Sequence, residues 1–135
     1  MSSIFHRNAR FGVRFSQVPE MECSLWAALT DKHINTPMGV TAENLAEKYN
    51  ITREDADKLA LMSQQRWAAA QKAGRFKEEM VPIPFKNRKT GAEEHFEIDE
   101  HPKPQTTMES LGKLPSVFKK NGTVTAGNAS GKSAP

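Results

Sequence analysis

Cysteine is almost missing from this sequence: Cys23 is the only one among 135 residues. A single cysteine excludes an internal disulfide and fits a reducing compartment. No apolar run approaches the roughly 20 residues that a membrane-spanning helix needs, so no membrane partner is expected. An excess of one charge is also missing, because 19 basic and 16 acidic residues leave a formal net charge of +3. That surplus is too small to predict a nucleic-acid partner, since such binding depends on many clustered cations.

Acidic residues are absent from residues 1–19, where three arginines occur among serine and phenylalanine. This composition is typical of a mitochondrial transit peptide. The alternative is an ordinary basic segment of the folded protein. Asn8 and Gly12 weaken an amphipathic helix in this segment, because both residue types are poor helix formers.

Two helices are the clearest elements that the sequence predicts. Thr41 is a good N-cap for the first, which we expect to end at Asn50. The second follows Thr52 and ends near Gly74, where glycine is a common stop. Small and apolar residues recur along the second helix at spacings of three and four, so they predict a stripe that faces the core. This stripe consists of Ala56, Leu59, Ala60, Ser63, Trp67, Ala70 and Gly74.

Shorter elements are predicted on both sides of these helices. Residues 21–29 have helical character, and residues 35–39 form a break. Residues 81–86 are expected to be extended because proline blocks a helix, and they pair with residues 94–98 as a hairpin.

The C-terminal part of the chain combines a short helix with a glycine-rich stretch. A capping box at residues 106–109 starts the helix, which continues through Leu114. Residues 121–122 predict a turn, and residues 123–126 a short strand. The stretch GTVTAGNASG, residues 122–131, serves either a hairpin turn or a ligand that approaches the backbone closely.

Local chemistry offers few catalytic candidates. Cys23 follows the acidic Glu22, whereas an activated thiolate needs positive or dipolar surroundings, so a structural or incidental thiol is expected. An alternating set of side chains on an extended strand would share one face and suit a divalent metal, but a solvated outer face is the favoured interpretation. Its members are His95, Glu97, Asp99 and His101.

Several stretches, in order and at matching spacing, resemble one family. They are RNARFG (7–12), SLWAALTD (24–31), PMGVTAENLAEKYNITREDAD (37–57), SQQRW (63–67), AGRFKEEMVPI (73–83) and VFKKNGTVTAGNASG (117–131). Together they are similar to the 3-ketoacyl-CoA thiolases of fatty-acid β-oxidation, above all to the mitochondrial acetyl-CoA acyltransferase type.

The resemblance implies an α+β fold, namely the mostly helical loop (lid) domain of the N-terminal half of a thiolase, with a small hairpin. Residues 1–131 correspond to this partial N-terminal region, and residues 132–135 form a tail that departs from the family. The arginine-rich start resembles an internal stretch of the family, so a transit peptide is not expected. The chain is therefore expected to be a fragment, truncated at both ends. The implied location is the mitochondrial matrix, with the peroxisome and the cytoplasm as alternatives.

Thiolase chemistry relies on a nucleophilic cysteine in C-x-S-G, a second cysteine in C-x-G-G, a histidine in G-H-P and an asparagine in N-E-A-F. In the family the first cysteine takes the acyl group, the histidine activates it, and the second cysteine acts as acid and base. None of the four motifs occurs in this sequence. The chain alone is therefore expected to be inactive, without catalytic residues, metal or resident cofactor, and with coenzyme A (CoA) as its ligand.

Part of the family's CoA-binding surface does have counterparts here. Ser130 matches a residue that contacts the pantetheine arm, and Thr106 matches one near the nucleotide end. Lys103 stands where the mitochondrial enzyme has arginine, so the charge is kept but the two-pronged phosphate contact is lost. Positions that resemble the lining of the CoA cleft are Leu29, Met38, Phe118 and Ala126.

Two functions therefore stay open. The first is a thiolase fragment that binds CoA or acyl-CoA weakly through this surface. The alternative is a non-catalytic interaction module that associates with intact thiolase subunits, because loss of the rest of a subunit would uncover apolar surface.

Overall fold

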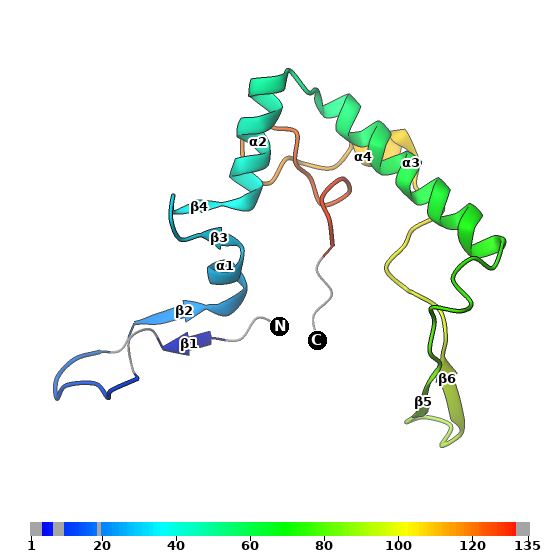
Figure 1. Cartoon of the computed structure of the whole chain (residues 1–135), viewed down its shortest axis with the longest axis horizontal. Coiled ribbons are helices and arrows are strands. Elements are labelled where there is room, and N and C mark those ends of the chain that lie inside the picture. Colours follow the sequence, from blue (N-terminus) through cyan, green and yellow to red (C-terminus); the bar gives the residue numbers. More distant parts are fainter. Residues whose placement is uncertain (1–3, 7–9, 19, 132–135) are drawn as a thin grey trace. The chain divides into compact units, whose positions relative to one another are not determined.

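The structure, a computed structural model, describes residues 4–6, 10–18 and 20–131 (Figure 1). The four-residue tail predicted at 132–135 lies outside the described residues. Helices and short strands alternate irregularly, so the fold is α+β as expected. The elements are β1 (Ile4–His6), β2 (Met21–Cys23), α1 (Ser24–Ala28), β3 (Thr30–Asp31), β4 (Thr36–Pro37), α2 (Met38–Tyr49), α3 (Arg53–Lys72), β5 (Ile83–Lys86), β6 (Glu93–Phe96) and α4 (Met108–Gly112). No helix within the described ranges is both long and apolar enough to cross a membrane.

The chain divides into two compact units. The first contains the chain up to Thr52 together with Ser116–Val124, and the second contains Arg53–Pro115 together with Thr125–Gly131. The division falls inside the glycine-rich stretch 122–131, so the first three residues of this stretch belong to one unit and the other seven to the other.

The strands form three antiparallel pairs, β1 with β2, β3 with β4, and β5 with β6. The predicted hairpin is confirmed: β5 and β6 pair from Ile83 opposite Phe96 to Lys86 opposite Glu93. Its turn is closed by Asn87, whose side-chain oxygen accepts a hydrogen bond of 2.9 Å from the Lys89 amide. The expected helix over residues 21–29 is only partly correct, because its first three residues pair with β1 and leave a five-residue helix α1.

Helix α2 begins earlier than its sequence predicts. Thr41 is not the N-cap, because the helix already starts at Met38 after the extended residue Pro37. The Met38 amide donates to the Leu29 carbonyl at 2.9 Å, so a distant backbone group replaces a side-chain cap. The C-terminus is as predicted: Asn50 ends the helix in the left-handed conformation, with φ of 54°.

Gly39 lies inside α2, although residues 35–39 were expected to break the chain. A Cβ atom at this position would collide with the Phe118 ring, so glycine is needed for the close approach of that ring. Phe118 also stacks on Trp26, with 6.5 Å between ring centroids. The glycine of this helix therefore serves packing rather than chain reversal.

In the second unit, α3 confirms the long predicted helix, and Gly74 has the positive φ of a stop signal. Helix α4 is also confirmed, but its capping box lies one residue later than predicted. Thr107 accepts from the Ser110 amide at 3.2 Å, and Ser110 Oγ accepts from the Thr107 amide at 3.0 Å. Thr106 is not the cap because its hydroxyl donates to the Lys103 carbonyl instead.

Each unit buries few side chains, and some of them are polar. Among the described residues, Ala46 and Glu43 are buried in the first unit, and Leu111, Asp57 and Thr125 in the second. The predicted core stripe of α3 is wrong, because none of its seven residues is buried. Leu59 is 61% exposed, and Ser63 is exposed as well. The buried residue of this helix is instead Asp57, because neighbouring segments approach α3 from its first turns.

Candidate functional site

The first three residues of the glycine-rich stretch are held by Glu43 of α2. One carboxylate oxygen accepts from the Thr123 amide at 2.8 Å and from the Thr123 hydroxyl at 2.9 Å, and the other accepts from the Val124 amide at 2.8 Å. The strand predicted over residues 123–126 does not form, because these amides bind the carboxylate. A Cβ atom on Gly122 would lie 2.7 Å from the carboxyl carbon of Glu43. Glycine is therefore required here.

The charge of Glu43 follows from these contacts. Burial by itself raises the pKa of Glu43, but the Thr123 and Val124 amides, the Thr123 hydroxyl and the Lys119 charge together hold it below its ordinary value. Glu43 is thus a buried anion at neutral pH.

The following residues of the stretch are held by Asp57 of α3. One Asp57 oxygen accepts from the Asn128 side-chain amide at 2.9 Å, and the other accepts from Arg53 Nε at 2.8 Å. Asn128 also accepts, through its side-chain oxygen, from the Thr125 amide at 2.8 Å. The Arg53 guanidinium reaches further and donates to the Leu111 and Leu114 carbonyls at 2.7 and 3.1 Å.

A tight turn is the result. The fully buried Thr125 accepts a hydrogen bond from the Ala129 amide at 3.1 Å through its carbonyl. Gly127 packs so closely that a Cβ atom there would lie 2.6 Å from a methyl group of Leu111. The backbone of residues 125–129 is therefore fixed by hydrogen bonds and packing within the second unit.

A cavity of about 320 Å³ lies between this turn and α3. Ser130, which is exposed, is among the residues that line it. The Gly131 backbone lies directly against the His101 ring, so a side chain on Gly131 would collide with it. The α3 residues on the wall are Ala56, Leu59, Ala60, Ser63 and Gln64. Hydroxyl, carboxamide and imidazole groups beside small apolar ones suit a ligand with both amide and hydrocarbon parts.

Lys103 and Thr106 lie next to this cavity. The Lys103 amide donates at 2.8 Å to the side-chain oxygen of Gln64, a residue of the cavity wall. Thr106 donates to the Lys103 carbonyl through both its amide and its hydroxyl, at 3.0 and 2.7 Å. The structure therefore brings Ser130, Lys103 and Thr106 into one neighbourhood. Ala126, exposed at the turn, is not part of the cavity wall.

The other three predicted residues gather in the first unit. Leu29 and Met38 are joined by their backbone hydrogen bond, and Phe118 lies against the adjacent Gly39. The Met38 side chain is 60% exposed, which leaves an apolar surface at the start of α2. Six of the seven predicted residues thus form two groups, one in each unit, whereas Ala126 of the second unit belongs to neither group.

The side chains that shape the glycine-rich stretch were not predicted as site residues. Asp57 and Asn128 are 71 positions apart, so no local pattern connects them. Gln64 and His101 were equally missed, the latter because it was considered only as a metal ligand. The one available signal was the density of small residues around Asn128, which indicates that the backbone there packs closely against other groups.

The alternating set that includes His95 and Asp99 does not form a metal site. Strand β6 ends at Phe96, so the alternation on one face stops there. Within the described residues no three histidine, cysteine, aspartate or glutamate side chains are grouped to hold a metal ion. Cys23 is half-buried at the end of β2.

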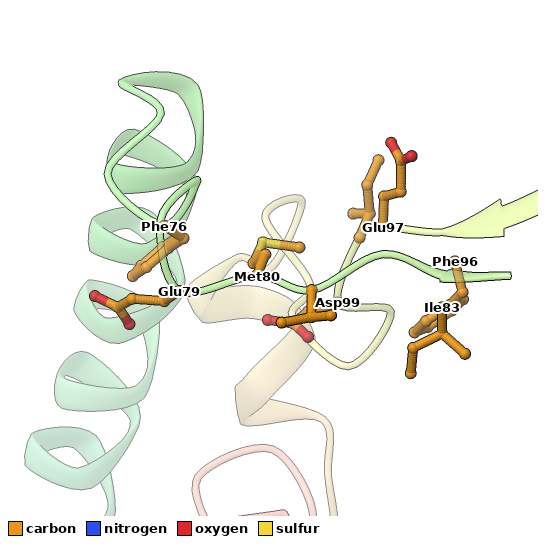
Figure 2. A pocket seen from close by; sticks show the side chains of 9 residues that line it. Phe76, Glu79, Met80, Ile83, Phe96, Glu97 and Asp99 are labelled. Carbon is orange, nitrogen blue, oxygen red and sulfur yellow. The ribbon is translucent and has the colours of Figure 1, made fainter.

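A second hollow, of about 340 Å³, lies beside the base of the hairpin (Figure 2). Ile83 and Phe96 lie side by side there, as expected from their cross-strand pairing, and Phe76 and Met80 approach from the turn segment that follows α3. None of the seven predicted residues lines it. The cavity beside Ser130 is therefore the one that the sequence analysis supports.

Residues 1–133 match the family model of the thiolase N-terminal domain, and the chain belongs to the thiolase family. The predicted family and the thiolase-like fold are thereby confirmed.

Particular relatives lie within this family. Over 127 residues the chain is 61% identical to mitochondrial 3-ketoacyl-CoA thiolase of Mus musculus, covering 94% of this chain and 32% of that protein. The crystal structure of human mitochondrial 3-ketoacyl-CoA thiolase matches with a TM-score of 0.83 at 55% identity, over 96% of this chain and 32% of that chain. A second human structure, in complex with CoA, matches with a TM-score of 0.78 at 54% identity, over 96% and 31%. The chain therefore spans about a third of the length of these relatives.

Proposed function

We propose that this chain supplies part of the CoA-binding surface of a mitochondrial 3-ketoacyl-CoA thiolase, an acyltransferase of fatty-acid β-oxidation, and works in the mitochondrial matrix. Residues 1–131 would be its loop (lid) domain. The observation that carries the proposal is the cavity beside Ser130, bounded by a turn whose backbone is fixed. The human relative solved in complex with CoA, similar over 96% of this chain, supports the choice of ligand.

The cavity has the right chemistry for the pantetheine arm. That arm alternates amides with short hydrocarbon segments, so it needs hydrogen-bonding groups beside small apolar ones. Ser130 and Gln64 would bind the amides, and Ala60 would contact the hydrocarbon. Lys103, exposed next to Gln64, would offer its ammonium group to a phosphate of the nucleotide end, near Thr106. The apolar contacts proposed in addition are Leu29, Met38, Phe118 and Ala126.

Catalysis is not proposed for the 135 residues alone. They contain none of the four cysteine, histidine and asparagine motifs on which thiolase chemistry relies. We propose weak binding of CoA or acyl-CoA, with acyl transfer requiring the remainder of a thiolase. Association with thiolase subunits stays a prediction.

Isothermal titration calorimetry with CoA tests the proposal. We expect a millimolar dissociation constant for the native chain and roughly three- to tenfold weaker binding for Ser130→Ala, the loss of about one hydrogen bond. Lys103→Gln is expected to weaken binding by a similar factor at low salt. Its matched control is Lys89→Gln, which removes an exposed lysine in the hairpin turn of the same unit. No heat at millimolar CoA, or equal effects of the two lysine variants, would contradict the proposal, as would thiolysis by the pure chain.

A further inference from the structure

A buried polar network holds the turn that carries Ser130. Asp57 is only 2% exposed, and each of its carboxylate oxygens accepts a hydrogen bond from a side chain, one from Asn128 and the other from Arg53. A buried carboxylate is costly unless it is paired and hydrogen-bonded, so these contacts must be maintained in the folded chain.

Asn128 is chemically specific in this position. Its side-chain nitrogen donates to Asp57, while its side-chain oxygen accepts from the Thr125 amide. A carboxylate of the same shape keeps the acceptor but has no donor, and it would face the Asp57 carboxylate as a like charge. A leucine of similar size supplies neither group. Only a carboxamide can satisfy both neighbours at neutral pH.

The network also joins three segments of the second unit. Arg53 connects the Asp57 carboxylate to the carbonyl groups of Leu111, within α4, and of Leu114, just beyond its end. Leu111 in turn packs against Gly127, one residue before Asn128. The backbone on both sides of Asn128 is thus fixed relative to α3, whose side chains form the wall of the cavity.

We propose that Asn128, acting through Asp57, is a positioning residue for CoA binding, an inference that rests on the proposed function. It holds residues 127–131 in the conformation in which Ser130 and the turn backbone face the cavity. The side-chain groups of Asn128 are engaged with Asp57 and Thr125, so its contribution to the ligand is indirect. Because the turn is already ordered before CoA binds, no binding free energy is used to order it, and the affinity for CoA is higher.

The test is a charge-conserving exchange of the two side chains. Asn128→Asp alone opposes two carboxylates and is expected to weaken CoA binding at least tenfold at neutral pH. The double variant Asn128→Asp with Asp57→Asn reverses the hydrogen bond, because the new carboxamide at position 57 donates to the new carboxylate at position 128. The acceptors for Arg53 and the Thr125 amide are both kept. We expect the double variant to bind CoA within about threefold of the native chain.

Ala46→Gly separates positioning from a general loss of stability. It loosens a buried site of α2 in the first unit and leaves the network intact. We expect it to lower the unfolding midpoint while leaving CoA affinity unchanged under conditions where the chain is folded. Native affinity in Asn128→Asp would overturn the inference. So would a double variant no better than the single one, or an Ala46→Gly loss equal to that of Asn128→Asp.

Hydrogen exchange measured without ligand keeps this inference distinct from the proposed function. The amides of residues 125–131 are expected to exchange faster in Asn128→Asp and to regain their protection in the double variant. If the native chain binds no CoA, the proposed function fails while this exchange pattern still reports on the turn. If the exchange rates of the turn are unchanged by Asn128→Asp, positioning by Asn128 is wrong whatever the CoA affinity.

Discussion

At the scale of single residues, two buried carboxylates decide the shape of the glycine-rich stretch. Glu43 is satisfied mainly by backbone amides, whereas Asp57 is satisfied by two side chains. From sequence alone, acidic residues in a helix are expected on its solvated face, because burial of an unpaired charge is unfavourable. The amides that satisfy Glu43 and the Asn128 side chain that binds Asp57 lie far along the chain, and this is why the sequence analysis did not identify these two positions. Only Arg53, the other partner of Asp57, is close in sequence, four residues away.

The first prediction concerns the pH dependence of stability. The pKa of Glu43 in the folded chain lies below its ordinary value, so the unfolded state binds the proton more readily. The stabilisation is therefore complete above the unfolded-state pKa and is lost as the pH falls through the lower folded-state pKa. Urea unfolding followed by circular dichroism from roughly pH 7 to pH 3 should show stability declining with acid.

Glu43→Gln is the matched variant for this measurement. A carboxamide of the same shape has one acceptor oxygen where the carboxylate has two, so we expect a loss of about 1–3 kcal/mol at neutral pH. Its stability should also depend less on pH than that of the native chain. An equally steep decline in both proteins would show that Glu43 is not responsible.

A second prediction at this scale concerns Gly39. Gly39→Ala places a methyl group into the Phe118 ring, and we expect a loss of about 1–3 kcal/mol from overpacking. Gly112→Ala, at the end of α4, is the control because a Cβ atom there meets nothing within 4 Å. That change should be neutral or slightly stabilising, since alanine favours a helix. A similar unfolding midpoint for both variants in urea would contradict this account of Gly39.

At the scale of elements, local signals sufficed where the structure relies on local contacts. The long helix α3, the β5–β6 hairpin and the stop at Asn50 follow from spacing, proline and turn residues, and all were predicted. The start of α2 was missed because its first amide binds the distant Leu29 carbonyl. The spacing of the α3 stripe correctly predicted a helix, but its burial was predicted wrongly, since part of the stripe lines an open cavity rather than a core.

Helix α4 provides a prediction for an element. Thr107→Ala removes the side-chain acceptor of the capping box, and we expect a cost of about 1 kcal/mol. Thr107→Ser keeps the hydroxyl and should retain most of the stability. Thermal unfolding of the native chain and the two variants checks the position of the cap. Equal unfolding midpoints for the alanine and serine variants would contradict it.

At the scale of the whole molecule, the family and the α+β fold were predictable from ordered stretches of sequence. The grouping of the candidate residues was not. Ser130, Lys103 and Thr106 are brought together around Gln64, which the sequence analysis did not name as a site residue. Leu29, Met38 and Phe118 meet through Gly39 and one backbone hydrogen bond. Both groupings depend on tertiary contacts, which cannot be predicted from residue type and spacing.

The most direct test of the central claim is a two-dimensional ¹H–¹⁵N NMR titration of the chain with CoA. The account predicts progressive shift changes at millimolar CoA in the amides of residues 127–131, and in those of Gln64, Lys103 and Thr106. Amides around Phe76 and Ile98, beside the second hollow, should remain in place. Absence of any change, or changes confined to that second hollow, would contradict a CoA site at Ser130.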